Sequence, residues 1–190
     1  QGHLDLIMRA KKENDGGCIV VVCGFTGDKG EIVDLPMKRR YRYVREMFSD
    51  DNLVAVCGIN DTELGIEKYP NGWEKWLTEF NKIYNSFVLN PEITQKVWYV
   101  GDPEYQTGLA IRGEKAILLD RNENLICATS IRNNPIKNWS KICGPFKRAF
   151  STNILIAGTA SEGKTTLTQD LGKYFNAPYS YEWAREYMRK

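Results

Sequence analysis

The stretch Ile19-Val20-Val21-Val22-Cys23 is a continuous run of apolar, mostly β-branched residues. Such a run is typical of a strand that is buried on both faces of a sheet. Three further stretches are predicted as strands: Leu53–Ile59, Lys96–Gly101 and Ala116–Leu119. Amphipathic patterns around them predict three helices, at Leu4–Glu13, Met37–Phe48 and Gly72–Ile83. Alternating strands and helices predict an α/β fold with a parallel sheet covered on both faces, and ligands then bind beyond the carboxyl ends of the strands.

The composition excludes several classes of protein. The 190 residues carry 26 basic and 24 acidic side chains, and a formal net charge of +2 argues against a protein that works mainly by coating nucleic acid. The longest apolar run, Cys18–Cys23, is far shorter than the roughly 20 residues of a membrane-spanning helix. No secretory signal region is visible at the start of the sequence. We therefore expect no membrane partner.

The cysteines indicate a reducing compartment. There are five, an odd number, and none forms a CxxC pair, which is a poor basis for a disulfide framework. The only histidine is His3, so a structural zinc site is not expected either. Buried, reduced thiols are typical of a cytoplasmic protein, and we expect that localisation.

The sequence changes character over residues 147–152. A fresh apolar run at 153–157 is predicted as a strand, and a glycine loop and a helix at Thr166–Phe175 follow it. We therefore predict two domains, residues 1–147 and residues 148–190. The second stretch is too short for an independent core of this type, and no strand precedes the first helix, so we expect both domains to continue beyond the printed sequence.

The octapeptide Gly158-Thr159-Ala160-Ser161-Glu162-Gly163-Lys164-Thr165 fits the pattern GxxxxGK(S/T) of a phosphate-binding loop. In such a loop successive backbone N–H groups point at phosphate oxygens, and the N-terminus of the following helix adds partial positive charge. We expect Lys164 to reach the β- and γ-phosphates of ATP and the hydroxyl of Thr165 to hold Mg2+. Thr166, the next residue, is included in the predicted ATP site.

Two further anion-binding elements are predicted in the first domain. Gly2 and His3 open a helix, where the glycine allows a ligand close to the backbone and the histidine can donate to a phosphate oxygen. The small hydroxylated residues Thr129 and Ser130 precede Arg132, whose forked guanidinium suits phosphate, ahead of an expected helix. Taken singly, His3 and Arg132 are also compatible with solvated residues at helix ends.

Together these elements resemble the nucleotidyltransferase superfamily, whose members carry an HxGH element and an ISxTxIR element. Gln1-Gly2-His3 matches the end of the first element. The stretch Ile126–Arg132 matches the second, with Cys127 where serine is usual.

The order of the motifs resembles the NadR family more closely. Tyr69–Trp76 comes first, Thr129–Trp139 second, and the phosphate-binding loop third. The stretch Tyr181–Tyr187 is similar to the WEYGREF stretch early in the kinase half of that family, with Ala184 in place of glycine. The resemblance therefore extends over essentially the whole chain.

The resemblance implies a bifunctional enzyme of NAD biosynthesis and salvage. In that family a nicotinamide mononucleotide adenylyltransferase on a Rossmann-like parallel sheet is joined to a ribosylnicotinamide kinase on a P-loop α/β fold. The first activity transfers AMP from ATP to nicotinamide mononucleotide and yields NAD and pyrophosphate, with Mg2+ offsetting charge. Carried over by motif, His3 and Arg132 are the expected catalytic residues. Gly2, His3, Thr129, Ser130 and Arg132 form the expected ATP site of this domain.

Asn71 and Trp73 are the expected binding residues for nicotinamide mononucleotide. A tryptophan face can stack on a cationic pyridinium ring, a contact worth roughly 0.5–2 kcal/mol. Trp73 and Trp76 are equally compatible with core positions on the apolar face of a helix. Arg40 and Arg42 resemble an arginine-bearing helix of the family, although a solvated charged face is the simpler interpretation.

Two other classes of protein share some of these features. An aminoacyl-tRNA synthetase also carries HxGH but pairs it with a KMSKS-like loop, whereas this chain has Thr129–Arg132. A nucleotide-sensing regulatory module would bind ATP and NAD without turnover. No stretch resembles a DNA-binding module, so DNA is not an expected partner, and the sequence leaves the formation of a homo-oligomer open.

Overall fold

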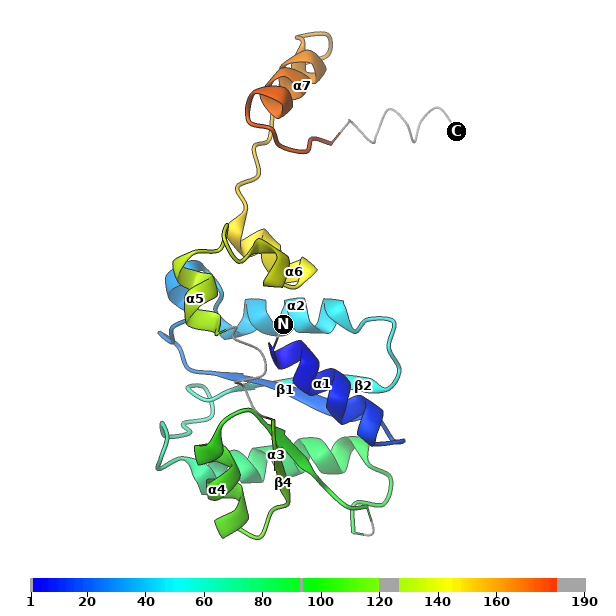
Figure 1. The fold of residues 1–190 in the computed structure, drawn as a ribbon, viewed down its shortest axis with the longest axis vertical. Coiled ribbons are helices and arrows are strands. Elements are labelled where there is room, and N and C mark those ends of the chain that lie inside the picture. Colours follow the sequence, from blue (N-terminus) through cyan, green and yellow to red (C-terminus); the bar gives the residue numbers. More distant parts are fainter. Residues whose placement is uncertain (1, 93, 120–126, 181–190) are drawn as a thin grey trace. The chain divides into compact units, whose positions relative to one another are not determined.

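The computed structural model describes residues 2–92, 94–119 and 127–180. The chain divides into two units, residues 1–151 and residues 152–190 (Figure 1). Arg148 belongs to the first unit because its guanidinium pairs with Glu46 and lies 4.9 Å from the ring centroid of Tyr43, both on helix α2 (Met37–Met47). The division therefore falls after Ser151, rather than after Lys147.

Parallel strands run through the first unit, as predicted. β1 (Cys18–Gly24) pairs with β2 (Val54–Asn60), and β3 (Trp98–Val100) pairs with β4 (Ala116–Leu118). Among the described residues these strands form two two-stranded parallel sheets, with no ladder between β1 and β3. Among these strands, β1 has a paired neighbour on one side. It is therefore half-buried along most of its length, whereas burial on both faces was expected.

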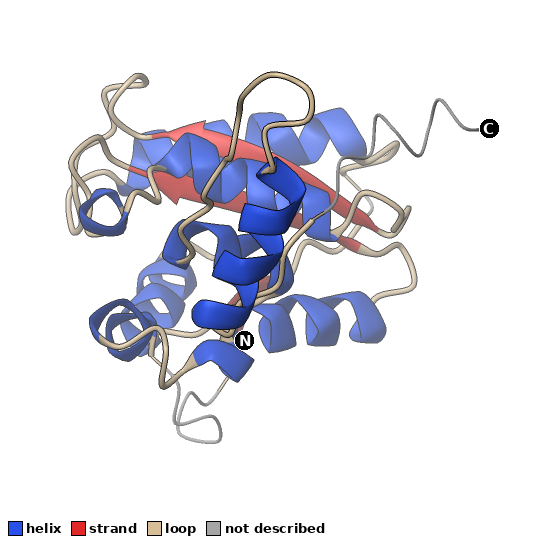
Figure 2. Cartoon of the chain, turned by 90° about the horizontal axis from the view of Figure 1, so that it is seen from above, coloured by secondary structure: helices blue, strands red, loops and turns tan. Residues whose placement is uncertain are grey.

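Helices lie on both sides of the strands of this unit (Figure 2). The three predicted helices are present as α1 (Gly2–Glu13), α2 and α3 (Trp73–Phe87). α4 (Pro103–Ile111) was not predicted, although it begins with a cap: the Asp102 side chain accepts the N–H of Glu104 at 3.2 Å. The remaining elements are α5 (Ala128–Asn133), α6 (Gly144–Lys147) and the 3-10 turns Glu31–Val33, Trp139–Lys141 and Arg148–Phe150.

The core of the first unit lies where α3 and α4 meet the β3–β4 pair. Trp73 and Leu77 of α3 pack with the fully buried Leu109 of α4. Trp76 stacks on Trp98 of β3, with ring centroids 5.7 Å apart. This arrangement confirms the apolar face predicted for α3. A Cβ atom at position 108 would lie 2.4 Å from the Trp73 ring, so glycine there lets α4 approach that ring.

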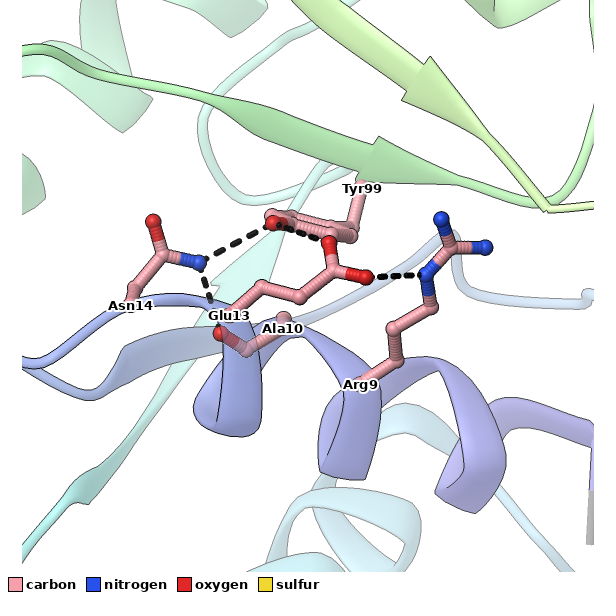
Figure 3. Close-up of polar contacts among 5 residues, drawn as sticks. All are labelled: Arg9, Ala10, Glu13, Asn14 and Tyr99. Carbon is pink, nitrogen blue, oxygen red and sulfur yellow. Dashed lines mark hydrogen bonds and ion pairs between the residues drawn. The ribbon is translucent and has the colours of Figure 1, made fainter.

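A polar network ties the end of α1 to β3 (Figure 3). The Tyr99 hydroxyl donates to Glu13 Oε2 at 2.9 Å and accepts from Asn14 Nδ2 at 3.0 Å. Asn14 also donates to the carbonyl of Ala10 at 2.7 Å, and Arg9 pairs with the other Glu13 oxygen at 2.6 Å. The network therefore fixes α1, which carries Gly2 and His3 at its other end, against the β3–β4 pair.

Tyr99→Phe is expected to lower the free energy of unfolding by about 1 kcal/mol, because it removes a hydroxyl that is bonded to both Glu13 and Asn14. Urea unfolding of the two proteins measures the difference. Tyr41→Phe is the matched control, since no hydrogen bond joins its hydroxyl to the described residues. Equal stability of Tyr99→Phe and wild type would contradict the anchoring role.

The same network carries a pH dependence. Arg9, and then Tyr99, hold the pKa of Glu13 below its ordinary value of 4.5. A lowered carboxyl pKa stabilises the fold above the pKa of the unfolded state, and this contribution is lost as the pH falls through the folded-state pKa. The stability difference between wild type and Tyr99→Phe should therefore narrow when the pH is taken below 4.5.

The second unit contains α7 (Lys164–Tyr174), preceded by a loop. The prediction of a strand at 153–157 is wrong, because a strand needs a partner and the described residues of this unit form no other strand. Ile154 and Leu155 are consequently exposed, by 66% and 89%. None of the helices in the described part of the chain combines the length and apolar character needed to cross a bilayer.

Candidate functional site

Gly2 and His3 stand in the first turn of α1, as predicted, and both are exposed. A Cβ atom at Gly2 would meet nothing within 4 Å, so the backbone here is open to approach. Gln1, the residue before them, lies outside the described residues. The turn therefore presents an accessible imidazole at a helix N-terminus.

The second predicted anion-binding element forms helix α5 itself. The helix begins at Ala128 rather than beyond Arg132, because Cys127 adopts an extended conformation and its Sγ accepts the N–H of Ser130 at 3.3 Å. Thr129 and Ser130 thus lie in the first turn, and Arg132 lies within the helix. The Arg132 Nη2 donates to Thr129 Oγ1 at 2.9 Å, so these two side chains do come together. Ile126 lies outside the described residues.

Hydrogen bonds make the Cys127 thiol more acidic. Its pKa is lowered chiefly by the backbone and side-chain hydrogen bonds of Ser130, with smaller effects from Thr129 and the charge of Arg132. The thiol is exposed. Cysteine therefore performs the capping role that serine usually has at a helix start.

Trp73 is largely buried, as its alternative role in the core predicts, but it also lines a hollow between α3 and α4, and its stacking on a pyridinium ring stays a prediction. Its ring is 7% exposed and packs edge-on against Tyr105 and Trp76, with centroids 5.5 Å away in each case. The Arg112 guanidinium lies 5.0 Å from the ring centroid. Asn71, in contrast, is exposed in the turn before α3.

Two tyrosines beside Asn71 were not predicted. Tyr69 and Tyr105 stack with ring centroids 5.8 Å apart, and both are partly exposed. Tyr69 borders a shallow hollow of about 480 Å³ that runs along α4 from Pro103 to Arg112, with Trp73 on the side of α3. Tyr69 opens the motif that ends at Trp76, so the sequence contained a signal for it. Tyr105 comes from the unpredicted helix α4.

A charged cluster at the carboxyl ends of β1 and β2 was also missed. Arg40 of α2 pairs with Asp28 instead of facing solvent, and a Cβ atom at Gly24 would lie 2.3 Å from its Nη2. Asp61 is 4% exposed, and its backbone N–H donates to the carbonyl of Gly24 at 3.1 Å. Burial raises the pKa of the Asp61 carboxyl, against the opposing effects of the backbone N–H of Gly24, which favours the carboxylate, and of the Arg40 charge.

This cluster has unsatisfied polar atoms. Arg40 Nε and Asp61 Oδ1 are buried without a hydrogen-bond partner among the described residues. Because ligands of parallel sheets bind at this edge, the cluster belongs to the candidate site of the first unit.

The phosphate-binding loop of the second unit leads directly into α7, which starts at Lys164 instead of the predicted Thr166. Thr165 and Thr166 are exposed in its first turn. Gly163 and Ser161 have positive φ angles of 75° and 67°. Lys164 Nζ donates to the carbonyl of Thr159, so the lysine reaches back over the loop.

The loop suits Mg2+ held mainly by a nucleotide. Within the described ranges, no group of three or more His, Cys, Asp or Glu side chains is placed to hold a metal ion. Mg2+ in phosphate-binding loops needs little from the protein, because phosphate oxygens and waters fill most of its coordination positions. The single hydroxyl of Thr165 at the helix start fits that donor set.

Comparisons with known proteins cover almost the whole chain. No family model matches it. The trifunctional NAD biosynthesis/regulator protein NadR of Escherichia coli K12 is 28% identical over an alignment of 195 positions, which covers 98% of this chain and 46% of the relative. The protein of the same name from Salmonella typhimurium LT2 has the same identity and coverage. The chain thus spans about half the length of these relatives.

Solved structures agree with the sequence comparison. A crystal structure of NadR protein in complex with NR has a TM-score of 0.77 and 35% identity, over 100% of this chain and 52% of that one. A second, in complex with NAD and AMP-PNP, has a TM-score of 0.73 and 35% identity, over 99% and 53%. Sequence and fold together support the resemblance seen in the motifs: the chain is similar to NadR over almost its whole length.

Proposed function

We propose that the first unit, residues 1–151, carries a nicotinamide mononucleotide adenylyltransferase, and that the second unit, residues 152–190, is the beginning of a ribosylnicotinamide kinase. The observation that carries the proposal is the match of 99% of the chain to NadR protein crystallised with NAD and AMP-PNP. The match to NadR protein in complex with NR, over 100% of the chain, supports the kinase substrate. The protein would act in NAD biosynthesis and salvage, with ATP as a substrate of both activities.

The adenylyltransferase reaction joins two anions, so its main requirement is neutralisation of charge and in-line placement. His3, beside the open backbone of Gly2, would donate to ATP phosphates. Thr129 and Ser130 would hold phosphate oxygens from the first turn of α5. Arg132, already oriented by its bond to Thr129, would face the leaving pyrophosphate. Bound Mg2+ would offset the remaining negative charge.

Nicotinamide mononucleotide would bind at the carboxyl ends of the strands. Asn71 stays the proposed contact residue because it is exposed in the turn before α3. Trp73 supports this turn from the core, and Tyr69 supplies an exposed aromatic ring beside it. Arg40 and Asp61 lie at the same edge of the strands, and each has one buried polar atom without a hydrogen-bond partner among the described residues.

The kinase unit would bind ATP at the phosphate-binding loop, residues 158–166. Lys164 would leave the Thr159 carbonyl for the β- and γ-phosphates, and Thr165 would hold Mg2+. We propose the cytoplasm as its compartment, in keeping with five free cysteines.

The deciding experiment incubates the full-length protein with ATP, Mg2+ and nicotinamide mononucleotide and measures NAD and pyrophosphate. Equal amounts of both products are expected. Binding of ATP and NAD without any product would favour the nucleotide-sensing module instead. Replacing nicotinamide mononucleotide by ribosylnicotinamide in a parallel assay tests the kinase activity, with ADP as the measured product.

Arg132→Lys is expected to keep most of the ATP affinity and to lose at least about tenfold in kcat for NAD synthesis. A guanidinium donates two parallel hydrogen bonds to phosphate, whereas an ammonium is a compact point charge. Because charge on the leaving pyrophosphate grows in the transition state, the loss should appear in kcat. Steady-state kinetics with varied ATP measure it, and Arg42→Lys on the exposed face of α2 is the control. Unchanged kcat in both Arg132→Lys and Arg132→Ala would refute the role.

A further inference from the structure

The shallow hollow beside α4 is lined by aromatic and charged side chains. Its volume is about 480 Å³, which is within the range of small-molecule sites. Tyr69 and Trp73 line it from the turn before α3 and from the start of that helix. Glu104, in the first turn of α4, and Arg112, directly after the last turn, line it from the other helix. The hollow therefore combines two aromatic rings with one acid and one base.

One end of the hollow lies close to the carboxyl ends of the strands. α4 follows β3, which ends at Val100, so Glu104 comes only a few residues after that strand. Glu104 acts electrostatically on Tyr69, which stands in the connection between β2 and α3. The end formed by Tyr69 and Glu104 therefore belongs to the edge at which ligands of parallel sheets bind.

One planar cation of the protein already lies on an aromatic ring of this hollow. The Arg112 guanidinium is 5.0 Å from the ring centroid of Trp73, within the range of a cation–π contact. Glu74 Oε1 and the carbonyl of Gly108 hold it there, each at 2.9 Å. Tyr69, the other aromatic residue of the lining, is 48% exposed, and no cation of the described residues lies over its ring.

Acidic groups act on the exposed tyrosine and on the ring that it stacks against. Tyr69 stacks on Tyr105, with ring centroids 5.8 Å apart. The pKa of Tyr69 is raised by burial and then by Glu104 and Asp102. The pKa of Tyr105 is raised by burial and then by negative charges that include Asp102 and Asp61. The strongest electrostatic effects on both rings therefore come from acids.

Ion pairs do not neutralise the two acids at this end of the hollow. Neither Asp102 nor Glu104 is in an ion pair with another described residue. Lys68, which precedes Tyr69 in the sequence, lies over Phe25 instead, with its Nζ 5.6 Å from the ring centroid. An aromatic ring beside such carboxylates attracts an organic cation, whereas a neutral ring of the same shape gains only the stacking contact.

We propose that Tyr69 and Glu104 make the first unit selective for a positively charged pyridinium ring over the neutral dihydropyridine ring of a reduced nicotinamide nucleotide. The proposal rests on the proposed adenylyltransferase activity of this unit. Both forms of nicotinamide mononucleotide carry the same phosphate, which attacks the α-phosphorus of ATP and releases pyrophosphate. They differ in the hydride on the ring, so a difference in rate reports on the ring. A cation–π contact changes affinity by a factor of about 2 to 30, and we expect about tenfold.

Pyrophosphate release by the full-length protein measures this selectivity, as the ratio of kcat/KM for the oxidised and the reduced mononucleotide. The wild-type ratio is expected to be about ten. Glu104→Gln and Tyr69→Leu should each lower it at least about threefold by slowing the oxidised substrate, whereas Tyr69→Phe keeps the ring and most of the ratio. Asp15→Asn is the matched control, because it removes an exposed carboxylate from the turn before β1, at the other end of the strands.

The ratio separates selectivity from folding, because a damaged fold slows both substrates alike. Equal kcat/KM for the two mononucleotides in wild type would overturn the proposal and leave the adenylyltransferase in place. A wild-type ratio near ten that neither Glu104→Gln nor Tyr69→Leu changes would overturn it as well. Absence of any product with either substrate would contradict the proposed function instead.

A second measurement needs no turnover and tests the site even in that case. The cation 1-methylnicotinamide and neutral nicotinamide share one ring and differ in charge. The backbone NMR signals of Tyr69 and Glu104 should shift at about tenfold lower concentrations of the cation than of the neutral compound. Equal responses to the two compounds, or no response to the cation, would overturn the proposal.

Discussion

Lys164→Ala in the full-length protein is expected to reduce ribosylnicotinamide phosphorylation by about a thousandfold and to leave NAD synthesis near the wild-type rate. Lys164 is the cationic side chain of the loop. A cation that stabilises the negative charge of the transferred phosphoryl group can account for a rate effect of this size. NAD synthesis would use His3 and α5, which belong to the other unit. Both activities are measured on one preparation, by ADP release with ribosylnicotinamide and by NAD formation with nicotinamide mononucleotide.

Lys173→Ala is the control for this variant, because it removes the same charge from the exposed end of α7. It should leave both activities unchanged. An equal loss of both activities in a folded Lys164→Ala protein would contradict two separate ATP sites. A Lys164→Ala protein with full kinase activity would contradict the assignment of the loop.

His3→Ala is expected to reduce NAD synthesis by about 100-fold or more, near 2.7 kcal/mol of transition-state stabilisation. The imidazole is exposed at the start of α1, where a donor to phosphate would act together with the helix N-terminus. The measurement is kcat/KM for ATP at saturating nicotinamide mononucleotide. His3→Gln keeps a donor and should retain more activity than His3→Ala.

The kinase activity of the same preparation is the internal control for His3→Ala. It should be unchanged, because His3 lies in the first unit. Wild-type NAD synthesis in His3→Ala would rule out the contact with ATP phosphates, and loss of both activities would indicate misfolding.

Local patterns predicted much of the first unit. Three elements were predicted from residues that are close together in the sequence, and the structure contains all three. They are the strands β1 and β2, predicted from apolar runs, and the helix α3, predicted from its amphipathic pattern. The run at 153–157 has the same local character but forms no strand. A strand is completed by hydrogen bonds to another strand, and a run of apolar residues carries no information about whether such a partner is present.

The site residues illustrate the same limit. The sequence predicted the helix starts at which Gly2, His3 and the phosphate-binding loop lie. Such starts can be recognised because glycines and capping residues determine the backbone conformation of their immediate neighbours. From the sequence, Trp73 was equally compatible with a contact to a ligand and with a place in the core. Its packing against Arg112 and Tyr105 favours the place in the core. Arg40 looked solvated, because nothing near it in the sequence indicates the pairing with Asp28.

The close approach of α4 to Trp73 has a consequence for how such chains diverge. A side chain at position 108 would begin 2.4 Å from the indole ring, and that ring is held by the core rather than free to swing aside. A larger residue at position 108 therefore requires a smaller side chain at position 73 or a shift of helix α4. Among related chains, glycine at 108 should accompany tryptophan at 73, and chains with a larger residue at 108 should have a smaller one at 73.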